Sequence, residues 1–167
     1  MKRVSILILG LLALALFANV YRNELAVWFN ADSFYKPIFT GDLDVLHPGS
    51  IVRAELTPSY DVRHGFFLTF PCEDLRYVHI DDMEGAVRYS FYANGIELES
   101  KTITIPRRPM MGIHSGGTCD IVLFTFDLPY HGHSTVTLEV VVESPILKLA
   151  PYREDIKCEV SPAYWPK

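Results

Sequence analysis

The chain has 167 residues, 49% hydrophobic and 13% aromatic, which is enough for one globular core and too little for two domains with separate cores. Its 20 acidic and 15 basic residues give a formal net charge of −5 at pH 7. A nucleic-acid-binding protein needs a basic surface that displaces counterions from phosphates, so this charge argues against that class.

The first expected element is a membrane helix. Lys2 and Arg3 precede an uncharged apolar run over residues 4–20, which as a helix would be about 25 Å long, against a hydrocarbon core of roughly 30 Å. The two basic residues should stay in the cytoplasm and place the rest of the chain on the far side of the membrane. The small residues in and just after the run make poor cleavage sites, which favours an uncleaved anchor over 1–29.

Two locations therefore remain open. An uncleaved anchor predicts a single-pass protein of the inner membrane with a periplasmic C-terminal domain. A cleaved signal peptide predicts a soluble periplasmic domain instead.

After residue 48 the apolar residues alternate with polar ones, as in half-buried β-strands. Residues 30–48, which lack such a period, form a predicted neck. Strands are expected over 51–56, 65–70, 87–93, 96–100, 101–105, 120–128, 135–143 and 156–160. Asn94-Gly95 supplies the two positive-φ positions of a type I′ turn, which predicts a hairpin there.

Half-buried strands must cover their apolar faces with a second sheet. The sequence therefore predicts an all-β fold, an antiparallel β-sandwich over 49–163 that follows the N-terminal transmembrane helix and ends in a short tail over 164–167. A jelly roll is the first topology expected, and an immunoglobulin-like sandwich is the alternative.

Three cysteines fit an exported domain. Cys72, Cys119 and Cys158 form no C-x-x-C pair, so neither a zinc ribbon nor a thioredoxin-like motif is indicated. In an oxidising compartment two of them can pair and leave one free. Cys158 alternates with Ile156 and Val160 and is expected to face inward, but the pairing stays open.

The stretch "PYHGHST" over 129–135 raises the question of a metal site. His131 and His133 could bind one ion from the same face of a strand, with His114 and Cys119 as further donors for copper or zinc. Gly132 and the position between two strands favour an exposed turn, so no metal and no other cofactor is expected. No nucleophile elbow, P-loop or dinucleotide motif occurs, and the chain is not expected to be an enzyme.

Binding is expected on loops at the end of the sandwich. The long glycine-rich loop 107–119 and the turn 129–134 are the predicted surface. The residues expected to contact a partner are Met110, Met111, His114, Tyr130, His131, His133 and Tyr92. Outward aromatic rings such as Phe67 and Tyr92 offer an alternative, a surface for carbohydrate.

The layout of the chain resembles small exported β-sandwich proteins of bacteria without assigned activity, some of which are similar to toxin-immunity proteins. The residues behind this resemblance are "MKRVSILILGLLALALF", "HGFFLTF", "VRYSFYANGIELES" and "FTFDLP…VTLEVVVESP". It implies a membrane-anchored, extracytoplasmic and non-catalytic module that binds another protein of the cell envelope. The alternatives are a carbohydrate-binding sandwich and an envelope metal protein that uses His131 and His133.

Overall fold

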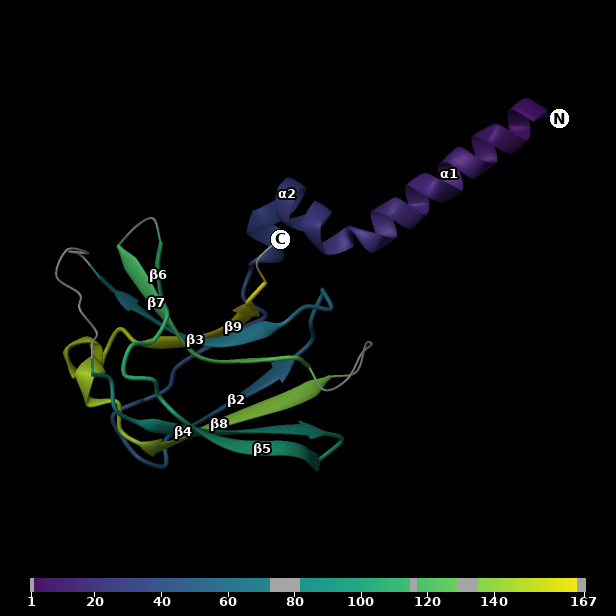
Figure 1. Ribbon diagram of the computed structural model, residues 1–167. Helices are drawn as coiled ribbons and strands as arrows, with labels where there is room; N and C mark the ends of the chain where they lie inside the picture. The colour runs from purple at the N-terminus through teal and green to yellow at the C-terminus, as the bar shows by residue number, and fades with distance from the viewer. Residues whose placement is uncertain (1, 73–81, 115–116, 129–134, 165–167) are drawn as a thin grey trace. The chain divides into compact units, whose positions relative to one another are not determined.

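The computed structural model describes residues 2–72, 82–114, 117–128 and 135–164 (Figure 1). The described chain falls into two compact units. The first contains the N-terminal helices up to residue 36, and the second, residues 37–164, contains every strand.

The N-terminal unit consists of two helices, α1 (Lys2–Val20) and α2 (Arg22–Phe34). The single helix expected over 1–29 is thus interrupted after Val20, and α2 carries charged residues such as Arg22 and Glu24. Within the part of the chain that the structure describes, no helix combines the length and the apolar character that a membrane span requires. The expectation of one transmembrane helix over 1–29 is therefore corrected: the described residues form two helices, and neither meets the requirements of a membrane span.

The second unit is a sandwich of two antiparallel sheets (Figure 1). The first sheet has the order β1 (Phe39–Gly41), β9 (Lys157–Pro162), β3 (His64–Pro71), β7 (Thr118–Phe126), β6 (Met111–His114). The second has the order β2 (Ile51–Leu56), β8 (Val136–Ser144), β4 (Ala86–Ala93), β5 (Ile96–Thr104). A 3₁₀ helix, η1 (Leu147–Tyr152), connects β8 to β9.

The strand order is that of a jelly roll. The strands β1 to β4 alternate between the two sheets, the hairpin β4–β5 stays in the second sheet, and β7, β8 and β9 alternate again on the return. The short strand β6 is an addition at the edge of the first sheet. The predicted β-sandwich is confirmed, and of its two candidate topologies the jelly roll is the one observed.

Alternation of side chains produces the core, as the sequence predicts. In β2, Val52, Ala54 and Leu56 are buried while their neighbours are exposed. In β8, Val136, Leu138, Val140 and Val142 are likewise buried. Successive strand residues point to opposite faces, so one face of each sheet packs against the other sheet.

The hairpin β4–β5 also follows the prediction. Asn94 and Gly95 have φ angles of 52° and 78°, the two positive values that a type I′ turn requires. The strand β5 then runs without a break from Ile96 to Thr104, so the two separate pieces expected over 96–100 and 101–105 are one strand.

Two segments without a clear period belong to the sandwich. The predicted neck over 30–48 contains β1, which pairs with β9, and contributes the buried residues Leu43 and Val45 to the core. The predicted loop over 107–119 contains β6, which pairs with β7. Strands of three and four residues are too short to show an alternation that sequence analysis can detect.

His64 is a buried histidine at the start of β3, 1% exposed, with its ring stacked on Phe126 at a centroid distance of 6.2 Å. Burial lowers its pKa, and this desolvation outweighs the hydrogen bond of the Val62 backbone and the charges of Asp127 and Asp61, which raise it. His64 is therefore neutral in the folded protein at neutral pH.

We expect this histidine to destabilise the fold in mild acid. Because the pKa of His64 is lower in the folded than in the unfolded chain, the unfolded chain binds more protons below about pH 6.5, and stability falls as the pH falls. The free energy of unfolding, measured by urea denaturation at pH 7 and pH 5, should drop less in the variant His64→Leu than in the wild type. An equal drop in both would contradict this role.

Candidate functional site

Of the two methionines in the loop that is expected to bind a partner, only one is exposed. Met110 is 68% exposed at the edge of the first sheet, whereas Met111 is half-buried and packs against the core. His114 is the last residue of β6. The loop therefore presents one exposed methionine, with the exposed Ile113 beside it in the strand.

The second half of the predicted surface, the turn 129–134 with Tyr130, His131 and His133, lies outside the described residues. Loop 107–119 runs along β7 as far as Val122, whose amide donates to the carbonyl of Met110 at 3.1 Å, and the turn follows beyond Phe126, where β7 ends. Four residue steps along a strand span about 13 Å, which separates the exposed Met110 from the end of β7.

Tyr92 lies on the outer face of the second sheet, on β4. It is half-buried, and its hydroxyl donates a hydrogen bond to Glu97 at 3.2 Å. Phe67 also points away from the core, but it is only 8% exposed because its ring lies over Gly65, where a Cβ atom would come within 2.5 Å of the ring. The predicted aromatic surface for sugars thus loses Phe67.

Cys119, a candidate metal ligand, forms a disulfide with Cys72. A disulfide sulfur has no thiolate to offer a metal, so Cys119 is removed from the candidate ligands. Among the described residues, no group of three or more His, Cys, Asp or Glu side chains is placed to hold an ion. Cys158 is free and buried as expected, and burial raises the pKa of its thiol to about 12.

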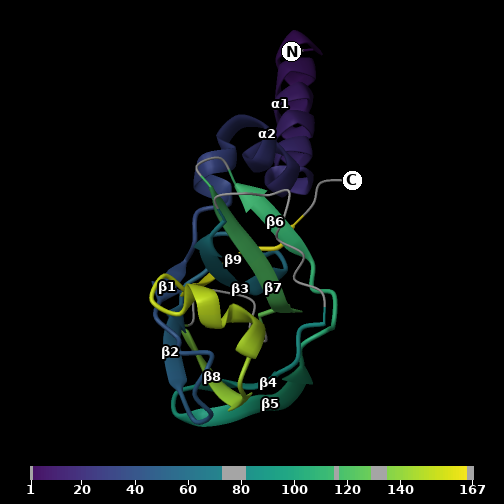
Figure 2. The same ribbon diagram turned by 90° about the vertical axis from the view of Figure 1, so that its left-hand side faces the viewer.

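The clearest concave site lies at one end of the second sheet, where β4 begins and where β5 and β8 end. It has a volume of about 800 Å³, and we call it the end pocket. Figure 2 looks onto this end of the sandwich, with η1 in front. The lining residues are Asp82, Met83, Glu84, Gly85, Ala86, Thr104, Ile105, Arg107, Ser144, Pro145, Leu147 and Lys148.

Backbone hydrogen bonds join the segments that form the end pocket. The amide of Met83 donates to the carbonyl of Arg107 at 3.1 Å, and the amide of Ile105 donates to the carbonyl of Gly85 at 3.0 Å. The amide of Ile146 donates to the carbonyl of Val45 at 2.9 Å. The pocket is therefore formed by segments whose backbones are fixed to their neighbours.

Gly85 allows the closest approach of two of these segments. Its φ is +149°, a region that L side chains rarely adopt, and a Cβ atom there would lie 2.8 Å from Cγ1 of Ile146 and 3.2 Å from the carbonyl oxygen of Pro145. Only glycine fits between the start of β4 and the segment that follows β8. Gly85 is itself one of the residues that line the end pocket.

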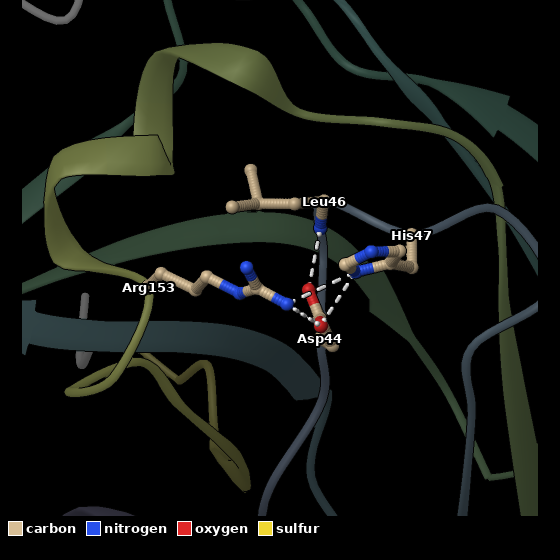
Figure 3. A network of polar contacts seen from close by, with 4 residues as sticks. All are labelled: Asp44, Leu46, His47 and Arg153. Carbon is tan, nitrogen blue, oxygen red and sulfur yellow. Dashed lines mark hydrogen bonds and ion pairs between the residues drawn. The ribbon is translucent and has the colours of Figure 1, made fainter.

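An ionic network supports the wall of the pocket that comes from the β8–β9 connection (Figure 3). Oδ2 of Asp44 accepts from Nη2 of Arg153 at 3.3 Å and lies 2.7 Å from Nδ1 of His47, and Oδ1 accepts from the amide of Leu46 at 3.0 Å. Desolvation alone would raise the pKa of Asp44, but these hydrogen bonds outweigh it and lower the pKa. Asp44 therefore stays ionised and links loop 44–47 to the end of η1.

The end pocket combines an apolar floor with charges of both signs. Met83 and Ile105 are buried at its base, and Leu147 is 68% exposed at its rim. Asp82 and Glu84 on one segment supply negative charges, and Arg107 and Lys148 on two other segments supply positive ones. None of the lining residues is aromatic. Such a site can bind an apolar group flanked by polar or charged groups.

Sequence patterns do not reveal the end pocket, which includes Asp82 and Glu84 of the segment directly before β4. The segments that form the pocket lie about 20 and 40 residues apart in the chain, and no local pattern links them. The one available hint was Gly85, a glycine directly before an alternating strand, which often marks a close approach of two backbones.

No family model matches the chain. No curated protein matches it either. Among solved structures, it is similar to a protein of Sulfurospirillum deleyianum, with a TM-score of 0.50, 8% identity and coverage of 76% of this chain and 98% of the other. This similarity shows a shared sandwich fold.

Two carbohydrate-binding modules also align. One, described by its specific mannan recognition, has a TM-score of 0.39 and 11% identity over 71% of this chain and 66% of its own. The other, a family 35 module from an environmental isolate, has a TM-score of 0.30 and 15% identity over 79% of this chain and 82% of its own.

Proposed function

We propose that this protein is a non-catalytic module that binds another protein through the end pocket. The observation that carries the proposal is the pocket itself, with a buried apolar floor, an exposed leucine at the rim and charges of both signs around it. Interfaces commonly have this composition, an apolar centre within a polar margin. A peptide segment with one apolar side chain between charged neighbours fits it.

A peptide fits the end pocket better than a sugar does. Carbohydrate recognition on a sandwich favours flat aromatic rings, and the pocket lining has none. The one outward tyrosine that remains among the candidate sugar-binding residues, Tyr92, lies on the outer face of the second sheet.

The proposed compartment is outside the cytoplasm. A disulfide such as Cys72–Cys119 persists in oxidising compartments and is rare in the cytosol. Apolar side chains are exposed along the N-terminal helix α1, among them Leu11, Leu14 and Phe17, and we propose that they attach the chain to a membrane. The intact mass of the cellular protein distinguishes a retained helix from a cleaved one.

A matched pair of variants tests the binding site. Leu147 at the rim of the end pocket and Ile96 beside the β4–β5 turn are 68% and 67% exposed, and they lie at opposite ends of the second sheet. The full chain would be cross-linked in intact cells as wild type, Leu147→Asp and Ile96→Asp, and the cross-linked proteins quantified by mass spectrometry. Because a charge replaces an exposed apolar side chain at the rim of the pocket, Leu147→Asp should reduce a specific partner about tenfold or more.

The variant Ile96→Asp should retain that partner at the wild-type level. Equal yields from the two variants would remove the end pocket from the function. Binding of purified chain to a glycan array that is lost in Tyr92→Ala would instead favour a carbohydrate-binding sandwich.

A further inference from the structure

The strand β5 is a long and open edge of the second sheet. It has nine residues, of which seven are exposed, and it pairs with β4 on one side only among the described strands. Edge strands with free backbone donors and acceptors are templates for pairing with another strand. The side chains of β5 indicate which strand fits this edge.

The charges of β5 are arranged so that the strand complements itself. Glu99 and Lys101 lie on either side of Ser100 and point to the same face, since they stand opposite Phe91 and Tyr89 of β4. In an antiparallel pair of two β5 strands centred on Ser100, Glu99 of each copy stands opposite Lys101 of the other. The pairing creates two ion pairs of opposite charge, each of which favours the register.

On the opposite face of β5, a row of polar side chains passes through Ser100. Ser100 stands opposite Ser90, with their hydroxyls 2.8 Å apart, and Ser90 in turn stands opposite Glu139, which accepts from Arg53 at 2.7 Å. Pairing at Ser100 extends this polar row into a second copy without placing a charge against an apolar residue at the centre.

We propose that two copies of this chain associate edge to edge through β5, in an antiparallel register centred on Ser100, to form a continuous eight-stranded sheet. The association is a closed two-fold contact, because each β5 strand uses its one open edge. The paired edge meets the end pocket only at Thr104, the last residue of β5. The inference does not depend on the proposed function.

Cysteine cross-linking tests the register directly. Directly opposed residues of an antiparallel pair have Cα atoms about 4.5–5.5 Å apart, within the range that a disulfide bridges. The full-length variant Ser100→Cys should therefore form a disulfide-linked dimer under mild oxidation, seen on a non-reducing gel. The matched variant Thr104→Cys, exposed in the same strand, should not, because its two copies would lie about 27 Å apart.

Charge reversal tests the ion pairs. In Lys101→Glu the new glutamate of each copy faces Glu99 of the other, so both pairs become repulsive. The dimer, measured by analytical ultracentrifugation, should weaken about tenfold or more. The double variant Glu99→Lys with Lys101→Glu restores opposite charges in both pairs and should recover the dimer. The control Glu55→Lys, on the other edge strand β2, should leave it unchanged.

A wild-type chain that is monomeric at all concentrations would overturn the proposal. So would equal cross-linking of the two cysteine variants, or oligomers that no β5 charge affects, as association through α1 would give. The single reversal Lys101→Glu is the cleaner variant, because Glu99 also accepts a hydrogen bond from the hydroxyl of Tyr89 at 2.8 Å.

Discussion

Replacing both Cys72 and Cys119 by alanine is expected to lower the free energy of unfolding by about 4 kcal/mol. The disulfide joins the end of β3 to the start of β7 across a separation of 47 residues, so its loss frees a long loop in the unfolded chain. In a domain of this size that corresponds to a fall of about 10–15 °C in Tm. Calorimetry of the wild type with and without reductant measures the same effect.

The control is Cys158→Ala, which keeps the disulfide and must retain its sensitivity to reductant. The double alanine variant should have the same Tm with and without reductant. Thiol trapping in cells then reports the compartment: an exported chain shows one thiol after denaturation, that of Cys158, and a chain held in the cytosol shows three. Three thiols in cells would contradict the proposed location outside the cytoplasm, and a wild-type Tm that does not change with reductant would contradict the stabilising role of the disulfide.

The substitution Gly85→Ala is expected to destabilise the protein by about 3 kcal/mol. A left-handed backbone costs an L residue about 1–2 kcal/mol, and overpacking costs a further 1–3 kcal/mol or so. Here the added methyl group would lie 2.8 Å from a side-chain atom of the buried Ile146 and 3.2–3.3 Å from two carbonyl oxygens. Urea denaturation of the variant and the wild type measures the difference.

Gly49 is the matched control for this glycine. Its φ is also positive, +84°, but no atom lies within 4 Å of the position that a Cβ would occupy. The variant Gly49→Ala should therefore cost only about 1 kcal/mol, the backbone part alone. If the two variants were equally destabilised, the close packing of Gly85 against the segment after β8 would not be the cause.

The sequence predicts the regular parts of the fold because their information is local. Alternation identifies β2, β4 and β8, and Asn94-Gly95 identifies the hairpin turn, since the side chains of one strand and one turn carry the whole signal. The exposed and buried faces of β2 follow from its own six residues.

The parts that the sequence does not predict depend on distant residues. In β7, a register shift opposite Phe66 and Phe67 changes which residues face inward: Ile121 is buried in the core, while Val122, which alternates with Phe124 and Phe126, is half-buried. The pairing of Cys72 with Cys119 follows from the adjacency of β3 and β7, which no local pattern gives. The end pocket likewise forms from segments that only the sheet order brings together.

The position of β9 has a consequence for the order of events in folding. This strand is the last of the sandwich in chain order, yet it lies inside the first sheet, between β1 and β3. Before β9 is synthesised, β1 has no partner in its sheet and β3 has one bare edge. Because β1 and β3 both need β9 as a neighbour, the sandwich can be completed only after β9 has left the ribosome. Translation of the final strand, and not the early hairpin β4–β5, sets the earliest moment at which the domain can close.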